Sequence, residues 1–504
     1  MSAAAAIIRA GAASGQRPWP RHALSRERWQ AMAAALDAAD APPLQGLWAE
    51  ADRVHALFLD AGSPLAASVE VDGGSYPALS PHCPAASWFE RMIHDLFGHT
   101  AEGGRDARGW LDHGAWATAA PLGPRQAALP PRVGAPEPPE FLPVEGEDLN
   151  QIGLGPVAGA IAEPAHLRLT AQGETLVRLE VRLGYAHKGT LGLMRGTPPR
   201  AAARFAARLS GSATVAHGLA YAHAVEAALG VVPPPRAVAL RAVMAELERI
   251  RAHLDAAAAI LAEAGAAFLE TRFGWHREAM HEAAGRAFGH RLMMDGVAPG
   301  GLATDLAADG AAAIRAALAA LAAELPDLVR RLDRSASLGA GIGRIAPDLA
   351  LRFGASGPVG RASRRASGHG GDARLVPGYP PYPVLGLDVP TRAEGDVAAR
   401  LRVRLDELPE SARLLRALLD ALPDGTIATA LPAASGEGLG VAESSRGTVW
   451  HWVRIEGGLV AAAFARDPDW LHWPLLEAAM RNGMLADLPL CAASFGLTSS
   501  GVDL

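Results

Sequence analysis

The chain has 504 residues, 50% of them hydrophobic, and is long enough for two domains that each bury a core. Its formal net charge of −6 gives it no overall basic surface, which argues against a nucleic-acid-binding protein. The two cysteines, Cys83 and Cys491, lie far apart, so the sequence excludes a disulfide framework and a zinc site built on Cys-x-x-Cys pairs.

The N-terminal segment is rich in alanine, but its apolar run is short and is soon followed by Arg and Pro. It therefore does not match a signal peptide. Apolar stretches elsewhere are interrupted by Arg, Glu and His before they reach a membrane-spanning length. These patterns predict a soluble cytoplasmic protein.

The first 120 residues combine helical and strand-like patterns. A helix is predicted over residues 26–38, with Ser25 placed to cap its N-terminus. Apolar runs at 54–59 and 67–71 predict strands. Residues 121–143 are crowded with proline, which a helix does not tolerate, and predict a linker. We therefore expect a small α+β domain at 1–120, a Pro-rich linker at 121–147 and a second domain at 148–504.

The second domain begins with a β-hairpin pattern and continues with helices. Residues 166–170 and 176–183 alternate apolar and polar side chains on either side of Gln172-Gly173. Between Leu240 and Leu254, apolar residues recur at three- and four-residue spacing, which predicts a long helix with one buried stripe. Further helices are predicted at about 198–229, 276–289, 304–334 and 394–421, and a second strand pair at 448–455 and 459–465. The fold class is therefore α+β, with a mainly helical second domain and β-hairpins near both of its ends.

A series of chemically distinctive motifs runs through the second domain in a fixed order. They are Gly155-Pro156-Val157, EPAHLRL at 163–169, LGYAHKG at 183–189, VAHGLAYAHAVE at 215–226, RAVMAELERIRAHL at 241–254, FGHRLMMDGVAPGG at 288–301, GPVGRAS at 357–363, EGDV at 394–397 and ESSRG at 443–447. In this order and spacing they resemble the large subunit of membrane-associated nickel–iron hydrogenases and the homologous quinone-site subunit of respiratory complex I. The resemblance covers the chain from about residue 148 onward and implies the hydrogenase large-subunit fold there.

The first domain resembles a second complex I subunit. Its motif WFERMIHDLFGH at 88–99, followed by Asp106, Arg108 and Trp116, is similar to the small α+β subunit that packs beside the quinone-site subunit. Fusion of the two modules is typical of the energy-converting, hydrogenase-4-related branch. The Tyr-x-His-Lys-Gly form of the motif around Lys188, the chain's single lysine, indicates the same branch.

The chain departs from the hydrogenases at the metal site. Hydrogenases of this family hold nickel on four cysteines arranged as two Cys-x-x-Cys pairs. Alignment of the motifs places Ser210, Ala213, Thr498 and Gly501 at these positions. Two hydroxyls and no thiolate do not make a nickel site, because soft transition metals need thiolate ligands. We therefore expect no metal in this chain and no nickel-dependent activity. Cys491 is expected to be an inert core thiol.

The chain departs from the complex I subunit as well. The histidine and the tyrosine of the family's quinone pocket align near Ala158 and Gly211, so the standard clamp for a quinone headgroup is missing. Small residues at 211, 213 and 501 favour an open pocket, in which an organic acceptor enters the space of the metal. No cofactor bound by this chain itself is predicted. The resemblance implies an iron–sulfur cluster in a partner subunit and a quinone-like ligand.

Three polar residues of the matching motifs are candidate site residues. Glu163 matches a glutamate that passes protons towards the membrane arm, and a solvated loop carboxylate is the alternative. Arg446 matches an arginine held over the metal, and it either binds an anionic or carbonyl group or only pairs with a carboxylate. His217 lies one turn after Ala213 and faces the same space, although a satisfied core histidine is the commoner explanation.

The resemblance implies two functions of different kinds. In the first, the chain belongs to a membrane-associated, complex I-like oxidoreductase complex and couples electron transfer from an iron–sulfur subunit to a quinone-like acceptor with proton movement. In the second, it is a catalytically inactive scaffold of such a complex. The implied partners are the iron–sulfur small subunit and antiporter-like membrane subunits, with the chain peripheral on the cytoplasmic face of the inner membrane. Nucleic acid and soluble metabolites are not expected as ligands, because the chain is acidic and has no Gly-rich phosphate loop.

Overall fold

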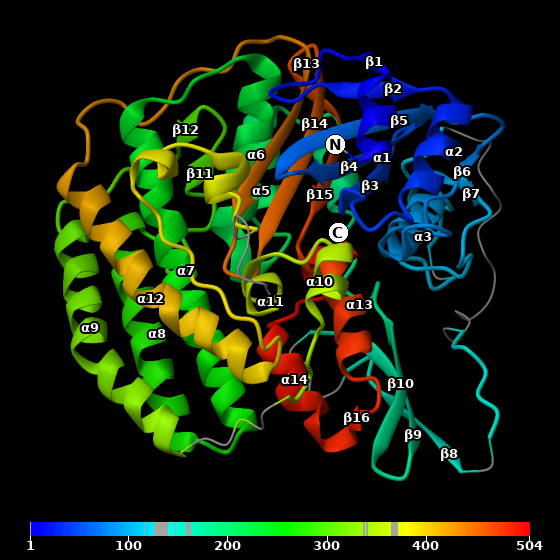
Figure 1. Ribbon diagram of the computed structural model, residues 1–504. Coiled ribbons are helices and arrows are strands. Elements are labelled where there is room, and N and C mark those ends of the chain that lie inside the picture. Colours follow the sequence, from blue (N-terminus) through cyan, green and yellow to red (C-terminus); the bar gives the residue numbers. More distant parts are fainter. Residues whose placement is uncertain are drawn as a thin grey trace.

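The structure is a computed structural model that describes residues 2–114, 116–124, 140–146, 148–157, 163–335, 338, 341–363 and 371–504. The predicted Pro-rich linker at 121–147 lies in large part outside the described residues, and so does Ala158. The described chain is a mixed α+β protein with small sheets and a helical bundle, which confirms the predicted fold class (Figure 1).

The N-terminal part is a five-stranded sheet flanked by helices. In spatial order the strands are β1 (Ala12–Ala13), β2 (Arg21–Leu24), β5 (Ser63–Glu70), β4 (Arg53–Asp60) and β3 (Leu44–Ala49). The other elements are α1 (Ala3–Arg9), α2 (Arg26–Ala35), α3 (Ser87–Phe97), and the parallel pair β6 (Ser75–Pro77) and β7 (Thr100–Glu102). Ser25 caps α2 as predicted, by accepting a hydrogen bond from the Arg28 amide. The helix ends earlier than predicted, because the Leu36 amide bonds back to the Ala33 carbonyl and tightens the last turn.

The predicted hairpin at the start of the second part is confirmed. β9 (His166–Gln172) and β10 (Thr175–Arg182) pair antiparallel. β8 (Leu149–Leu154) and β16 (Gly483–Met484) complete a four-stranded sheet in the order β16-β10-β9-β8. Gly173 has a φ of 57° in the turn, a conformation that glycine adopts without strain.

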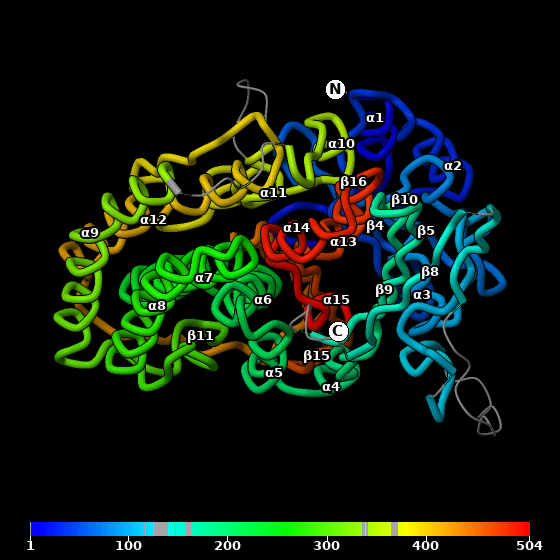
Figure 2. The backbone as a smooth tube through the Cα atoms, turned by 90° about the horizontal axis from the view of Figure 1, so that it is seen from below, coloured from blue at the N-terminus to red at the C-terminus, as the bar shows by residue number. Residues whose placement is uncertain are grey.

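The predicted long helix is α7 (Pro235–Glu263), and its apolar stripe from Leu240 to Leu254 is buried. α8 (Ala267–Phe288) and α12 (Val397–Asp420) pack against it, and α9 (Gly310–Ser335) packs against these two. Figure 2 shows this bundle on one side of the molecule, with the C-terminal helices between it and the N-terminal part. None of the helices in the described ranges is both long and apolar enough for a membrane crossing.

The remaining elements are short or lie near the C-terminus. They are η1 (Pro84–Ala86), α4 (Thr190–Met194), β11 (Val297–Ala298), β12 (Gly301–Leu302), α10 (Pro347–Arg352), α11 (Gly357–Ala362), η3 (Arg374–Gly378), η4 (Tyr382–Val384), α13 (Asp469–Ala479), η5 (Leu485–Asp487), α14 (Leu488–Phe495) and α15 (Ser500–Asp503).

The single helix predicted at 198–229 is wrong. The chain instead forms α5 (Pro199–Ala206), the short 3₁₀ turn η2 (Gly211–Ala213) and α6 (Thr214–Leu229). Ser210 is extended, and glycine at 211 disfavours a helix, so the two helices are separate. Across the break the Thr214 hydroxyl donates to the Ala207 carbonyl at 3.0 Å. The break leaves Ser210 and Ser212 directly before α6.

Helix α6 lies directly on the central three-stranded sheet. This sheet contains β13 (Gly436–Glu443), β14 (Thr448–Glu456) and β15 (Leu459–Arg466), and it includes the predicted strand pair. A Cβ on Gly436, Gly438 or Gly440 of β13 would overlap a backbone carbonyl oxygen of α6. The two-residue period of the strand thus matches successive turns of the helix, and glycine permits the close approach.

The N-terminal sheet covers the other face of the central sheet. Trp48 stacks on Phe464 of β15, with the ring centroids 5.2 Å apart, and contacts Trp452 of β14. Trp450 and Trp452 therefore point towards the N-terminal part, whereas His451 points towards α6. All three residues are buried. Both faces of β14 are covered, and alternation along a strand does not then separate core from surface.

A cluster of buried charges joins the helical bundle to the central sheet. Glu407 of α12 accepts hydrogen bonds from Arg361 of α11 at 2.8 Å and from Arg374 at 3.1 Å. It also pairs with His253 of α7 at 2.9 Å. Burial opposes ionisation of Glu407, but Arg361 and His253 outweigh it and hold the pKa of this carboxyl well below its usual range.

We expect Glu407→Ala to lower the free energy of unfolding by about 3–5 kcal/mol, because it leaves two arginines buried without their shared partner. Chemical denaturation of the full chain measures this change. Glu278→Ala is the control, because Glu278 is exposed and its pair with His281, a neighbour on its own helix, is weak in solvent. A loss of stability no larger than that of the control would contradict the structural importance of the cluster.

Candidate functional site

The β13–β14 turn fixes the position of Arg446. Within the turn, the Ser444 hydroxyl accepts a hydrogen bond from the Arg446 amide at 3.1 Å and donates to the Gly447 carbonyl at 2.8 Å. From α7, the guanidinium of Arg249 donates to the carbonyls of Glu443 and Ser444, at 2.6 and 3.0 Å. The turn is therefore held from inside and from the neighbouring helix, and the backbone of Arg446 is well positioned.

The side chain of Arg446 is buried among carboxylates and hydroxyls. It contacts Asp467 Oδ2 at 2.5 Å and Asp469 Oδ2 at 3.2 Å. It also donates to the hydroxyls of Ser210, at 3.2 Å, and Ser212. Burial alone would lower the pKa of Arg446, but the two aspartates outweigh burial and raise it above its ordinary value. The converse holds for Asp467, whose pKa is lowered by Arg446 and His217 against the effect of burial. Arg446 and Asp467 are therefore both charged.

His217 extends this group of residues into α6. Its Nε2 lies 3.0 Å from Asp467 Oδ2, and its Nδ1 lies 3.1 Å from Nε2 of His451. Both ring nitrogens of this fully buried histidine thus have partners, as the core-histidine interpretation requires. Burial, together with the neighbouring His217, holds the pKa of His451 well below its usual range, so His451 is neutral.

The segment 498–500 connects Glu163 to the same group. Thr498 donates from its amide and its hydroxyl to Asp469 Oδ2, at 2.8 and 3.0 Å. The next two residues bind Glu163: the Ser500 amide and the Ser499 hydroxyl donate to Glu163 Oε2, at 2.7 and 3.2 Å. Glu163 is only partly buried, so it lies at the outer end of this connection and Arg446 lies at the inner end. The structure therefore brings the three predicted site residues into one polar group.

The four positions of the family's nickel ligands do not fit a nickel site. The hydroxyls of Ser210 and Thr498 are bonded to Arg446 and Asp469, and Ala213 offers no donor atom. At Gly501, a Cβ would lie 2.5 Å from the Asp467 carboxylate, so the aspartate occupies the place of a fourth side chain. A guanidinium already lies between the two stretches, where it repels a cation. Across the described residues, no set of three or more His, Cys, Asp or Glu is arranged to hold a metal ion.

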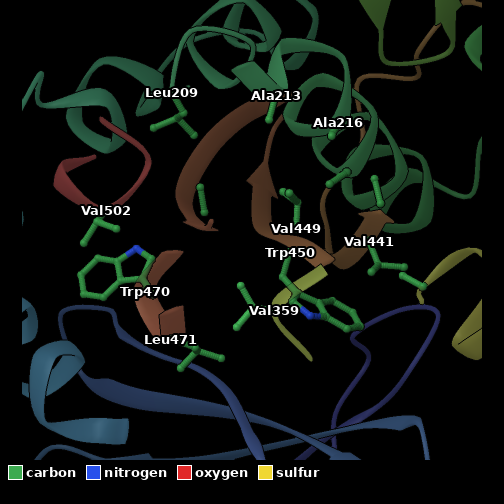
Figure 3. Close-up of a cluster of buried hydrophobic side chains, with 14 of the residues drawn as sticks. Leu209, Ala213, Ala216, Val359, Val441, Val449, Trp450, Trp470, Leu471 and Val502 are labelled. Atoms are coloured by element: carbon green, nitrogen blue, oxygen red, sulfur yellow. The ribbon is translucent and has the colours of Figure 1, made fainter. Parts of the chain in front are cut away.

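An apolar shell surrounds the charged group. Figure 3 shows Leu209 and Ala213 near the start of α6, Val502 of α15, Trp470 of α13 and Val449 of β14 in one buried cluster. These elements also carry or adjoin the polar residues of the site. The shell excludes water from the ion pairs, and electrostatic interactions inside it are stronger than in solvent.

Asp467, Asp469 and His451 complete the site and were not among the residues predicted from the sequence. Asp467-Pro468-Asp469 stands where β15 passes into α13, and Asp469 occupies the first turn of that helix, a position that favours acidic residues. Because this local preference already explains an acidic residue here, the sequence does not indicate that Asp469 binds Arg446. His451 stands between two tryptophans of β14, and its partner His217 lies far away in the sequence. A signal was present in the acidic pair itself, since two carboxylates that follow a buried strand need cationic partners.

Lys188 and Asp503 form a second charged group, which lies beside Glu163 and contacts the C-terminal residues. Lys188 donates to the carbonyls of Ser500 and Leu209, at 3.1 and 3.3 Å. Asp503 accepts hydrogen bonds from the amides of Gly184 and Ala186, at 2.8 and 2.7 Å. Burial raises the pKa of Asp503 to about 6, although these amides and Lys188 act in the opposite direction. Lys188 thus binds backbone carbonyls on both sides of the site, before η2 and in α15.

Comparison with known proteins finds two family models in the chain. The model described as the 30 Kd subunit of the respiratory-chain NADH dehydrogenase matches residues 26–126, and that of the 49 Kd subunit matches residues 269–435. Formate hydrogenlyase subunit 5 of Escherichia coli is 30% identical over 84% of this chain and 77% of its own length. The C/D subunit of the NADH-quinone oxidoreductase of Cereibacter sphaeroides is 27% identical over 99% of this chain and 97% of its own length.

The fold is also that of a solved respiratory complex component. A chain in the structure of the membrane-bound sulfane sulfur reductase, an archaeal respiratory membrane complex, matches with a TM-score of 0.65 and 24% identity. The match covers 72% of this chain and 100% of that chain. The predicted resemblance, with its fused small-subunit-like and large-subunit-like parts, is thereby confirmed.

We expect Gly501→Ala to lower the free energy of unfolding by about 1–3 kcal/mol, because its Cβ would press on the Asp467 carboxylate. Gly211→Ala is the matched control, since nothing lies within 4 Å of a Cβ at that position. Its stability is expected to stay within about 1 kcal/mol of the parent protein. Chemical denaturation gives both values, and equal effects of the two substitutions would contradict the placement of Asp467 against Gly501.

Asp503 predicts a pH dependence of stability. An acid whose pKa is raised by folding contributes stability below its unfolded pKa and loses that contribution as the pH rises through the folded value, here about 6. Asp503→Asn is therefore expected to reduce the loss of stability between about pH 4 and about pH 7 by about 3 kcal/mol. Denaturation at both pH values measures this difference, with the exposed Asp420→Asn as control. The same pH dependence of stability in Asp503→Asn and in the parent protein would contradict the raised pKa of Asp503.

Proposed function

Because the chain belongs to the family of complex I-related hydrogenase large subunits that includes formate hydrogenlyase subunit 5, we propose that it is the site-bearing subunit of a membrane-associated oxidoreductase complex. Relatives in this family are subunits of larger complexes of the hydrogenase and NADH-quinone oxidoreductase type. In our proposal, the chain couples electron transfer from an iron–sulfur partner subunit to a quinone-like organic acceptor with proton movement. It is not a nickel hydrogenase.

One observation carries this proposal: two hydrogen-bonded polar groups, joined by the backbone of residues 498–500, extend from Glu163 to His451 where relatives are expected to hold their metal. They run from Glu163 through the segment 498–500 to Asp469 and Arg446, and then through Asp467 to His217 and His451. The charges of this connection are buried and paired, which limits the free energy that their burial costs. Groups of this kind, in contact with a partly exposed carboxylate, suit proton transfer to a buried redox reaction.

The chemistry of the site follows from these contacts. A quinone-like acceptor becomes a hydroquinone by taking up two electrons from the partner subunit and two protons from the protein. Added electrons make the acceptor anionic, and the guanidinium of Arg446 stabilises negative charge that develops nearby. Glu163, the partly buried carboxylate at the outer end, exchanges protons with solvent and holds them beside the segment that carries Thr498 and Asp469.

A second function is favoured by a different observation. The guanidinium of Arg446 donates hydrogen bonds to Asp467, Ser210 and Ser212 and forms an ion pair with Asp469, so both of its terminal nitrogens have partners inside the protein. Asp467 in turn lies against Gly501. These contacts favour the alternative that the chain is a catalytically inactive scaffold, which fixes the partner subunits in their relative positions.

The partners and the location follow from the same proposal. We assign an iron–sulfur small subunit and antiporter-like membrane subunits as the partners of the chain. The chain is then peripheral to the membrane through these subunits, on the cytoplasmic face of the inner membrane. The quinone-like ligand belongs to the cavity shared with the iron–sulfur subunit, whereas NAD chemistry belongs to another subunit.

Reduction of a quinone analogue by the purified complex separates the two functions. We expect Glu163→Gln and Arg446→Ala each to lower the rate by about a hundredfold, because one loses the proton entry and the other the charge that stabilises the reduced acceptor. Glu263→Gln and Arg330→Ala are exposed controls of the same residue types and are expected to leave the rate unchanged. Complex assembly, measured by size-exclusion chromatography, is expected to be unaffected in all four variants. Unchanged turnover in the two site variants, or nickel in proportion to protein by elemental analysis, would overturn the proposal in favour of the scaffold or the hydrogenase.

A further inference from the structure

We propose that Glu443 is a second proton-holding residue of this site, which exchanges its proton with solvent through the hydroxyl of Thr448 and a cavity between the N-terminal sheet and the rest of the chain. This inference deepens the proposed function, since it gives the reaction a proton store close to Arg446. The cavity, the hydrogen bonds of Glu443 and its connection to the Arg446 turn support it in three steps.

The cavity has a volume of about 650 Å³ and lies between segments that are far apart in the sequence. The N-terminal part contributes Pro43, Gln45 and Leu59, and the second part contributes residues of α10, the loop to α11 and the start of β14. Leu351 on its rim is 63% exposed, so the cavity is reached from solvent. Most of its lining is apolar, but Gln45, Ser356 and Thr448 offer polar atoms to which water in the cavity binds.

Thr448 connects the cavity to Glu443. It lines the cavity beside Ser356, and its amide donates to the Ser356 hydroxyl at 2.9 Å. Its own hydroxyl donates to Glu443 Oε2 at 2.8 Å. A hydroxyl relays a proton by accepting one from a hydronium ion in the cavity and releasing its own to the carboxylate, so that hydronium becomes water and the carboxylate becomes a carboxylic acid. The step conserves charge, and reversal returns the proton to water.

The two oxygens of Glu443 have unequal surroundings. Oε2 accepts from Thr448 and from the Ala373 amide, the latter at 3.1 Å, whereas Oε1 is buried and has no hydrogen-bond partner among the described residues. An ionised carboxylate with one bare buried oxygen is costly, and protonation of the carboxyl group removes the charge that makes it so.

Charged groups of both signs face Glu443 from the elements packed around it. They are Asp372 before η3, Arg249 of α7, Arg361 of α11 and Arg466 of β15, together with the Tyr379 phenol, which accepts a hydrogen bond from the Glu443 amide; Arg374, Glu246 and Glu407 bind Asp372, Arg249 and Arg361 from behind. Burial, followed by the negative charge of Asp372, raises the pKa of Glu443 to about 7, and the nearby arginines oppose this shift. The residue therefore holds and releases its proton near neutral pH.

Glu443 is also coupled to the site. It ends β13 directly before the turn that carries Arg446, and Arg249 binds its carbonyl and that of Ser444. The Ser444 hydroxyl in turn accepts from the Arg446 amide. Negative charge that arrives at the site raises the affinity of a neighbouring carboxylate for protons. Glu443 is thus placed to bind a proton when electrons enter, and to supply it afterwards.

Infrared spectroscopy of the full chain tests the proton directly, without electron transfer. The difference between the parent protein and Glu443→Gln is expected to contain the carbonyl band of one protonated carboxylic acid. This band should disappear with a midpoint at about pH 7. Glu477→Gln removes a different carboxyl with a raised pKa and is the control for assignment. A difference spectrum without the band at about pH 6 would overturn the proposal.

Hydrogen–deuterium exchange of this band tests the relay. Thr448→Val removes the hydroxyl at nearly constant volume and is expected to slow exchange by at least about tenfold, whereas Thr448→Ser restores it. Equal exchange rates in the valine and serine variants would overturn the route through Thr448. If Glu443→Gln does not fold, the Thr448→Val and Thr448→Ser variants still test the proposal, because the carboxylic-acid band and its exchange rate are measured in both. Quinone reduction is not measured here, so failure of this proposal is distinguishable from failure of the proposed function.

Discussion

The buried ion pair between Arg446 and Asp467 is the interaction on which the rest of the site depends. Arg446 reaches Ser210 and Ser212 before α6 and, through Asp469, the segment 498–500 at the other end of the domain. In relatives that bind nickel, the metal is expected to join these two stretches. Here a guanidinium and two carboxylates join them instead. A pair of charges holds this position because it is shielded from water by the apolar shell and completed by hydrogen bonds.

The arrangement of the sheets explains how a turn between strands becomes so rigid. The glycines of β13 bring α6 against the central sheet, and the N-terminal sheet covers the opposite face through Trp48. The turn after β13 is consequently buried from both sides, and Arg249 of α7 closes it from a third. The same burial raises the pKa of Glu443 and lowers that of His451. Stability and proton chemistry at this site therefore share one physical cause, the removal of charged groups from water.

The sequence predicts much of the fold because most elements have local patterns. The stripe on α7 and the hairpin of β9 and β10 are examples, and the collinear motifs identify the family. The break before α6 was missed because one glycine competes with good helix formers on both sides. Glu163, Arg446 and His217 were found through motifs, whereas Asp467 and Asp469 were not, because their partners lie far away in the sequence. The small residues suggested an open pocket, but the space beside Gly501 is determined by a residue distant in the sequence. The Asp467 carboxylate lies against Gly501.

The most direct test of this account is a double-mutant cycle between Arg446→Met and Asp467→Asn, with the free energy of unfolding of the full chain as the readout. If the ion pair joins the stretch before α6 to the segment 498–500, in the place of a metal, the effects of the two substitutions on stability are strongly coupled. The account predicts a coupling energy of about 2–3 kcal/mol for this buried pair. Additive effects of the two substitutions would contradict it, because Arg446 would then not depend on Asp467 for its place in the site.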